Sequence, residues 1–295
     1  MSKHKQRDGI NTEKTSNDDV RDYYSQCHSI YHEKWSDDSD RESIHYGYFD
    51  EGTETLGEAV HNMKSKLADS VDLGPDDRVL DCSGGYGDNA TWQAKERGAE
   101  VVGLNISPLQ LSYARELAKE RGVDDKVEFR EDDFTKMETV EDNSFDVVWG
   151  LESICYADDK REFLEQAKRV LKDDGRIVVT DWYMEKRDLS FIEDLMVTQW
   201  LKGWRLSNYA HIDDFQDDLA DLGFENITSE NAEDNIMKSA FDIFLFSLWG
   251  YPLGKLLNFF GRQNDTELGN AVACFYQYPA LKSDAVTYSI VSAEL

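Results

Sequence analysis

A short run of small residues after an apolar segment is the part of the sequence best suited to binding a ligand. It runs from Val79 to Gly87 and reads V-L-D-C-S-G-G-Y-G. In an open parallel sheet, ligands bind beyond the carboxyl ends of the strands, where a Gly-rich loop brings backbone N–H groups close to them. Gly85 and Gly87 permit close approach and unusual dihedral angles. We therefore predict a binding loop here, directly after a strand that ends at Asp81.

The loop alone does not identify its ligand. Gly85-x-Gly87-x-x-Ala90 also satisfies the G-x-G-x-x-G/A pattern of dinucleotide-binding proteins, so a nicotinamide cofactor stays open. A Gly-rich turn that binds nothing is a further alternative.

The elements that position the loop are short β-rich runs alternating with helices. Ser107 opens one helix with Pro108 at its first position and Gln110 three residues on, a capping-box arrangement, and Gly122 closes it. Alternation of strands and helices predicts an α/β fold, a mostly parallel sheet with helices on both faces. Strands are expected at 78–81, 100–104, 126–130, 145–149, 177–180, 225–229 and 287–293.

Composition divides the chain into five predicted segments. We expect a disordered tail at 1–17, an N-terminal helical cap at 18–74 and the ligand-binding core at 75–184. A mainly helical, aromatic-rich cap at 185–270 and a return to the sheet at 271–295 follow.

The charge is strongly acidic, with 60 Asp and Glu against 32 Lys and Arg and a net charge of -28. Such a chain repels nucleic acid and other polyanions, so no nucleic-acid partner is expected. Salt screens this self-repulsion, which indicates a halophilic source.

The four cysteines lie far apart and include no C-x-x-C, so we predict no metal site and a reducing, cytoplasmic location. The chain start has no apolar signal-peptide core, and no run reaches the ~18 apolar residues of a membrane span. His28 and His32 lack the Glu of an H-E-x-x-H motif and are interpreted as surface residues of a helix.

Five landmarks in order resemble the class I S-adenosylmethionine-dependent methyltransferases. Val79 to Gly87 resembles their first motif, and Asn105 falls where their second strand places an acidic ribose ligand. Residues 131–134 (E-D-D-F) resemble their adenine-binding segment. Residues 144–149 and 169–178 resemble their fourth strand and the helix, turn and strand after it. The resemblance implies a Rossmann-like, seven-stranded fold and S-adenosylmethionine as cofactor.

The same resemblance implies roles for individual residues. Asp81 and the loop backbone at Gly85 would hold the methionine moiety, Asn105 the ribose, and Asp133 the adenine amino group, with Phe134 beside the ring. A carboxylate suits an amino donor, and an amide oxygen accepts from a hydroxyl. The chain departs from the family at Ser83, where glycine is usual, and at Asn105, where an acid is usual. The other expected cofactor contacts are Tyr24, Tyr48, Ser83, Gly87, Ile106, Gln110 and Leu151.

Within the class, the sequence is most similar to the tocopherol, sterol and sarcosine/dimethylglycine methyltransferases. Residues 44–48 (I-H-Y-G-Y) resemble their N-terminal I-H-x-G-x-Y element, 103–110 their G-x-x-L-S-P-x-Q and 149–153 their W-S-x-E-S. In such enzymes the N-terminal element closes over the sulfonium and the acceptor. The expected closing residues are Tyr24, His45, Tyr46 and Tyr48; simple packing of the cap is the alternative.

Methyl transfer from a sulfonium chiefly requires that the acceptor be positioned and water excluded. An aromatic carbon or a protonated amine also needs a base. Glu152, just past the fourth strand, is the candidate, with Tyr156 and His211 behind it.

The aromatic and aliphatic run at 241–260 favours a lipophilic acceptor, such as a prenylated ring, quinone or sterol, or a transient membrane contact. N-methylation of sarcosine or dimethylglycine to betaine is the alternative. From other classes, an NAD(P)-dependent oxidoreductase and a non-catalytic module that binds S-adenosylmethionine or lipid stay open.

Overall fold

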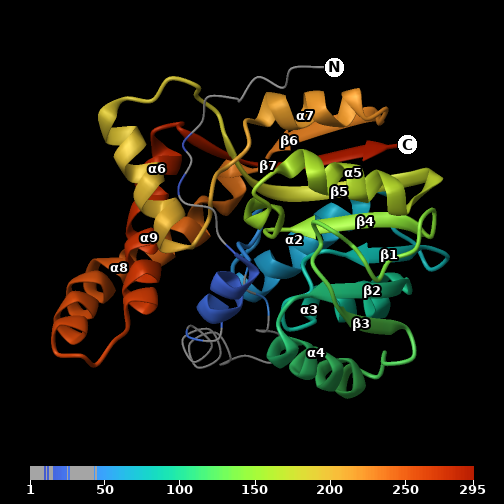
Figure 1. The fold of residues 1–295 in the computed structure, drawn as a ribbon, viewed down its shortest axis with the longest axis horizontal. Helices are drawn as coiled ribbons and strands as arrows, with labels where there is room; N and C mark the ends of the chain where they lie inside the picture. The colour runs from blue at the N-terminus through green and yellow to red at the C-terminus, as the bar shows by residue number, and fades with distance from the viewer. Residues whose placement is uncertain (1–9, 11, 13–15, 25, 27–42, 44) are drawn as a thin grey trace.

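The computed structural model describes residues 10, 12, 16–24, 26, 43 and 45–295. Most of the predicted tail at 1–17 lies outside these residues, as do His28, His32 and Ile44. In the described part, a central sheet carries helices on both faces, and a helical arm projects from one end (Figure 1).

The sheet has seven strands in the order β3-β2-β1-β4-β5-β7-β6. Strands β1 to β5 pair in parallel, whereas β7 is antiparallel to both β5 and β6. The predicted α/β class is confirmed. The strands are β1 (Arg78–Asp81), β2 (Glu100–Asn105), β3 (Val127–Glu131), β4 (Phe145–Leu151), β5 (Leu171–Met184), β6 (Glu225–Asn231) and β7 (Val286–Glu294).

Side chains alternate along the central strands and fill two cores. Val79 and Val147 join the core on the face of α2 to α4, whereas their neighbours Leu80 and Val148 join the core beneath α5 and α7. The helices are α2 (Leu56–Ser70), α3 (Asp88–Trp92), which continues as the π-helical turn η1 (Gln93–Arg97), α4 (Pro108–Arg121), the short η2 (Ile154–Tyr156), α5 (Lys160–Val170), α6 (Phe191–Gly203), α7 (Ile212–Asp221), α8 (Glu233–Phe259) and α9 (Asp265–Lys282).

Helix α4 begins and ends where its sequence signals predict. The Ser107 side chain accepts a hydrogen bond from the Gln110 backbone, Pro108 occupies the first turn and Gly122 takes a left-handed conformation at the end. The Gln110 side chain does not complete a capping box, because it accepts a hydrogen bond from Asn105 instead.

The C-terminal part contains more helix than the sequence predicts. Helix α9 continues to Lys282, past the expected boundary at residue 270, before β7 returns to the sheet. Helices α8 and α9 form a hairpin that packs against α6 and extends beyond the sheet (Figure 1). Among the described residues, no helix is both long and apolar enough to cross a membrane.

Candidate functional site

A pocket opens where β1 to β4 end, and it encloses about 1120 Å³, its open mouth included. The structure therefore brings most of the predicted site residues to one place. Those that line the pocket are Tyr24, Ser83, Gly85, Asn105, Ile106, Gln110, Asp133, Phe134, Leu151, Glu152 and Tyr156. In the described part of the chain, no group of three or more metal-ligating side chains is found.

The loop after β1 is pressed against β2 so closely that only glycine fits. A Cβ added to Gly84 would lie 2.2 Å from the carbonyl oxygen of Leu104. The next residue, Gly85, has a φ of +38°. Gly84 was not among the predicted contacts, although its place in the S-G-G run could have indicated it.

Ser83, which departs from the family pattern, ties the loop to β4. Its Oγ accepts a hydrogen bond from the Leu151 backbone at 2.6 Å and lies 3.2 Å from Ser153 Oγ. Where the family usually has glycine, the Ser83 side chain thus fixes the loop to the end of β4.

Asp81 lies beneath the loop and does not line the pocket. Its Oδ1 accepts from the Ser83 backbone at 2.8 Å, whereas the buried Oδ2 has no partner among the described residues. Burial raises the pKa of Asp81 to about 7, although the hydrogen bonds from Ser83 oppose the shift. Asp81 therefore supports the loop from below, and its side chain does not line the pocket in which a direct ligand contact was expected.

Gly87 also stands apart from the pocket. It precedes α3 with a φ of +90°, and an added Cβ would lie 2.7 Å from Ala114 Cβ. Its role is to let α3 pack closely on α4.

Asn105 acts as a brace between β2 and the loop. Its Nδ2 donates to the Gly85 carbonyl at 2.9 Å and to Gln110 Oε1 at 3.1 Å, and its Oδ1 accepts from the Ser107 backbone at 2.8 Å. The buried Nε2 of Gln110 has no partner among the described residues and is left to donate.

Asp133 and Phe134 form the far wall. Burial opposes the charge on Asp133, but hydrogen bonds from Asn17 and Thr135 outweigh it, so its pKa lies below the usual value. Asn17 Nδ2 donates to Asp133 Oδ2 at 2.9 Å, which brings the N-terminal segment against this wall. Phe134 packs edge-on against Phe163.

Glu152 is the most strongly perturbed acid that lines the pocket. Its backbone is left-handed, with a φ of +50°, which is uncommon for a residue other than glycine. Its Oε1 accepts from the Tyr46 backbone at 2.9 Å and from the Tyr288 hydroxyl at 2.7 Å. Burial raises the pKa of Glu152 to about 8, although these two hydrogen bonds favour the ionised form. Nearby, the hydroxyls of Tyr24 and Tyr156 are 3.2 Å apart.

Two predicted residues lie away from the pocket. The Tyr48 hydroxyl donates to Glu230 on β6 at 3.3 Å, because alternate side chains of the extended segment 45–49 point in different directions. His211 immediately precedes α7 and pairs with Met184 through a β-bridge. Helix α7 packs with α5, on the opposite face of the sheet from α2. Neither the cofactor contact of Tyr48 nor the catalytic role of His211 fits this placement.

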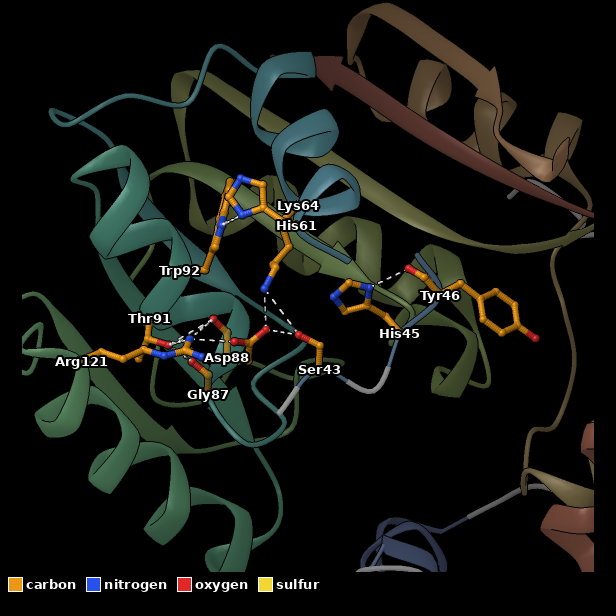
Figure 2. Close-up of polar contacts among 10 residues, drawn as sticks. All are labelled: Ser43, His45, Tyr46, His61, Lys64, Gly87, Asp88, Thr91, Trp92 and Arg121. Carbon is orange, nitrogen blue, oxygen red and sulfur yellow. Dashed lines mark hydrogen bonds and ion pairs between the residues drawn. The ribbon is translucent and has the colours of Figure 1, made fainter. Parts of the chain in front are cut away.

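A buried ionic cluster beside the pocket was not predicted (Figure 2). Lys64 Nζ lies 2.6 Å from Asp88 Oδ2, and Arg121 lies 2.7 Å from Asp88 Oδ1. The Ser43 hydroxyl donates to the same carboxylate. Burial opposes the charge of Asp88, but Lys64 and Arg121 outweigh it and hold its pKa well below the usual range. The cluster thereby joins the N-terminal segment, α2, α3 and α4.

His45, which is buried in the pocket wall next to this cluster, presents a hydrogen-bond acceptor. Its Nδ1 lies 2.8 Å from the Tyr46 carbonyl, which can only accept, so Nδ1 carries the proton (Figure 2). Burial and the charge of Lys64 lower the pKa of His45 to about 4, and the ring is neutral at pH 7. The buried Nε2 has no partner among the described residues.

The ionisable groups that line the pocket are mostly acidic: the carboxyl groups of Asp88, Asp132, Asp133 and Glu152. Asp88 is paired with Lys64 and Arg121, and burial favours the protonated form of Glu152. Arg21 is the only Lys or Arg among the described lining residues, and its Nε donates to the Ile106 carbonyl at 2.7 Å. Its other nitrogens approach Asp18 at 3.3 Å and Glu131 at 3.5 Å. A free cation for an anionic ligand is thus lacking among these residues.

Comparison with known proteins agrees with this geometry. Residues 80–179 match a family model described as a methyltransferase domain. The chain is 34% identical over 194 residues to 27-O-demethylrifamycin SV methyltransferase from Amycolatopsis mediterranei, covering 65% of this chain and 69% of that protein. It is 32% identical over 193 residues to the sarcosine/dimethylglycine N-methyltransferase of Halorhodospira halochloris, with 64% and 67% covered.

Coverage differs between relatives, since the alignments span only 57% and 36% of the length of two further curated proteins. Among solved structures, the [4+2]-cyclase SpnF superposes with a TM-score of 0.77 at 21% identity and covers 98% of both chains, which shows the shared fold. With the matching domain, two relatives covered over 69% and 67% of their length, and the pocket at the carboxyl ends of the parallel strands, the chain belongs to the class I S-adenosylmethionine-dependent methyltransferases.

Proposed function

We propose that the protein transfers a methyl group from S-adenosylmethionine to a small lipophilic acceptor that is uncharged or cationic. The observation that carries the acceptor class is the lack of a free cation in the described lining of the pocket, where the one Arg is already engaged. A buried anionic group would need a cationic partner there. Prenylated rings, quinones and sterols satisfy this requirement.

The residues present fit S-adenosylmethionine. Gly84 lets the loop pack directly on β2, where an added Cβ would collide with the Leu104 carbonyl, and Gln110 Nε2 in the pocket lining is a buried donor without a partner among the described residues. We propose that the loop at 83–85 and Leu151 hold the methionine part. Asn105 and Gln110 would face the ribose, and Asp133 with Phe134 the adenine, whose amino group suits a carboxylate.

When bound, the cofactor supplies a methyl group activated by its sulfonium. The remaining work falls to the chain's own residues. Glu152, held by Tyr46 and Tyr288, is placed to take a proton from the acceptor in its ionised form. Tyr24 and Tyr156, whose hydroxyls meet across the pocket, would exclude water, and His45 Nε2 would accept a hydrogen bond from a donor on the acceptor.

N-methylation of sarcosine or dimethylglycine is the second candidate, supported by the similarity to an enzyme of that name. Against it stands the acceptor's carboxylate, because the described lining of the pocket offers no free Lys or Arg to pair with it. The net charge of -28 supports the further proposal of a salt-rich cytoplasm as the working environment, because salt screens self-repulsion. Thermal unfolding in rising KCl tests that proposal: an increase in Tm is expected, and a Tm that falls would contradict it.

The decisive experiment measures transfer of labelled methyl from S-adenosylmethionine, in concentrated KCl, into either a total lipid extract or sarcosine. We expect label in the organic phase, and its loss in a folded Gly84→Asp variant, because the added side chain collides with the Leu104 carbonyl and displaces the loop. Label in betaine would move the assignment to the second candidate. A folded wild-type protein that binds the cofactor without transferring methyl would support a non-catalytic module.

A further inference from the structure

Helix α8 is apolar on two opposite faces, and the described residues cover only one of them. The inner face packs on α9, with Phe244 and Tyr251 against Phe275 at ring-centroid distances of 5.5 and 5.8 Å. The outer face, here called the outer stripe, consists of Trp249, Leu253, Leu256 and Phe260. Their spacing of three and four residues places them along one side of the helix.

The side chains of the outer stripe are strongly exposed to solvent, although all of them are apolar. Trp249 is 84% exposed and Phe260 65%, and Phe259 beside them is 81% exposed. From Trp249 to Phe260, which caps α8, the rise is roughly 17 Å, so the stripe extends along the second half of the helix. Figure 1 shows the hairpin of α8 and α9 standing away from the sheet. Contiguous apolar surface of this length marks a contact site.

The charges around the outer stripe differ from those of the whole chain. Residues 243–264 contain Lys255 and Arg262 and no Asp or Glu, although the chain carries 60 acidic residues. Lys255 Nζ lies over the Tyr251 ring at 4.6 Å, at the edge of the stripe. A second copy of this chain would bring a further charge of -28 and no carboxylate within this segment to pair with the two cations.

We propose that the outer stripe docks on the surface of a lipid bilayer that contains anionic phospholipid. The aromatic and aliphatic side chains enter the boundary between headgroups and acyl chains, and Lys255 and Arg262 meet the phosphates. The projection of the hairpin also holds the acidic body away from the lipid, and repulsion decays over about 8 Å at physiological salt.

The same helix connects this surface with the pocket. Ser239, in the first half of α8, accepts a hydrogen bond from the Gly47 backbone at 3.1 Å, and the Asn235 carbonyl accepts from Phe49 at 2.9 Å. These contacts fix the segment that carries His45 into the pocket wall. The inference rests on the proposed lipophilic acceptor, because docking would place the pocket near a bilayer that dissolves it.

Vesicle co-sedimentation without cofactor or acceptor tests the docking separately from turnover. The probes are vesicles of phosphatidylcholine alone or with phosphatidylglycerol, offered to wild type, a Trp249→Glu/Leu253→Ser variant and a Phe191→Ser control. Phe191, on α6, is 82% exposed and lies outside the stripe. We expect binding by wild type and control, with a preference for anionic vesicles, and at least about tenfold weaker binding by the double variant.

Equal binding by the double variant would overturn the proposal. So would a wild-type protein that ignores vesicles but forms a dimer in light scattering, with the double variant monomeric, because the stripe would then join two copies. Methyl transfer to a detergent-dispersed acceptor is measured on the same variants. If wild type transfers methyl but binds no vesicles, only the docking proposal fails.

Discussion

Replacing Glu152 with Gln is expected to stabilise the protein at neutral pH while reducing its activity. The ordinary pKa of a Glu side chain is 4.5, and burial raises that of Glu152 to about 8. Between these values the folded protein binds more protons than the unfolded chain, so the free energy of unfolding falls as pH rises. The stabilising contribution of the protonated carboxyl is complete below pH 4.5 and is lost as pH approaches and passes 8.

The magnitude follows from the pKa difference. At pH 7 the carboxyl is ionised in the unfolded chain but protonated in the folded protein. This difference lowers the free energy of unfolding by on the order of 3 kcal/mol, compared with a side chain that cannot ionise. Gln cannot ionise, and its amide oxygen can still accept from the Tyr46 backbone and from Tyr288. Glu152→Gln should therefore unfold at higher denaturant concentration than wild type at pH 7 and 8, and at a similar concentration at pH 4.

The assay is urea unfolding of both proteins from pH 4 to 8.5, together with methyl transfer over the same range. Asp81 and Asp181, whose pKa values burial raises to about 7 and about 6, remain in both proteins, so the difference between the curves isolates position 152. If Glu152 is the base, wild-type kcat rises about tenfold per pH unit below pH 8, and the variant loses this rise. A stability difference that does not change with pH would refute the reasoning.

Two further predictions compare a buried position with an exposed control. Gly84→Ala should destabilise by at least about 3 kcal/mol and weaken cofactor binding in calorimetry, because the neighbouring strand cannot yield. Gly57→Ala, with open space around it in α2, should instead stabilise by up to about 1 kcal/mol; equal effects would contradict the steric argument. Lys64→Met should cost about 3–5 kcal/mol in chemical unfolding, because it leaves Asp88 buried without its nearest cation. Lys238→Met breaks an exposed pair and should cost less than about 1 kcal/mol, and a similar loss in both would argue against burial as the cause.

The fold could be predicted from the sequence because local and global signals agree. Val79 and Leu80 alternate between two cores, as adjacent residues of a strand buried on both faces must. Ser107, Pro108 and Gly122 mark the ends of a helix through their own backbone preferences. Such signals act over a few residues and do not depend on the rest of the chain.

Site residues could be predicted where a strand end determines their position. Asn105 is the last residue of β2, Asp133 and Glu152 follow β3 and β4, and the sheet brings these strand ends together. Tyr48 lies in the N-terminal extended segment, and His211 precedes α7. At these two places the residue type does not determine which way the side chain points. In an extended segment, neighbouring side chains point in opposite directions, so His45 lines the pocket while Tyr46 lies in the core. The sequence does not show which residues point into the pocket, and the prediction for Tyr48 was wrong for this reason.

The ionic cluster shows why the remainder of the site could not be predicted. In the sequence, Lys64 has the pattern of a solvated residue on a helix, and nothing local relates it to Asp88. Burying the charge of Lys64 or of Asp88 alone would cost several kcal/mol. Both are buried here because Lys64 Nζ lies 2.6 Å from the Asp88 carboxylate, which also pairs with Arg121. The position of Ser43 and His45 at the pocket therefore depends on contacts between α2, α3 and α4. These contacts between helices exist only in the folded protein. A substitution in α2 can therefore alter the pocket even though no residue of α2 lines it.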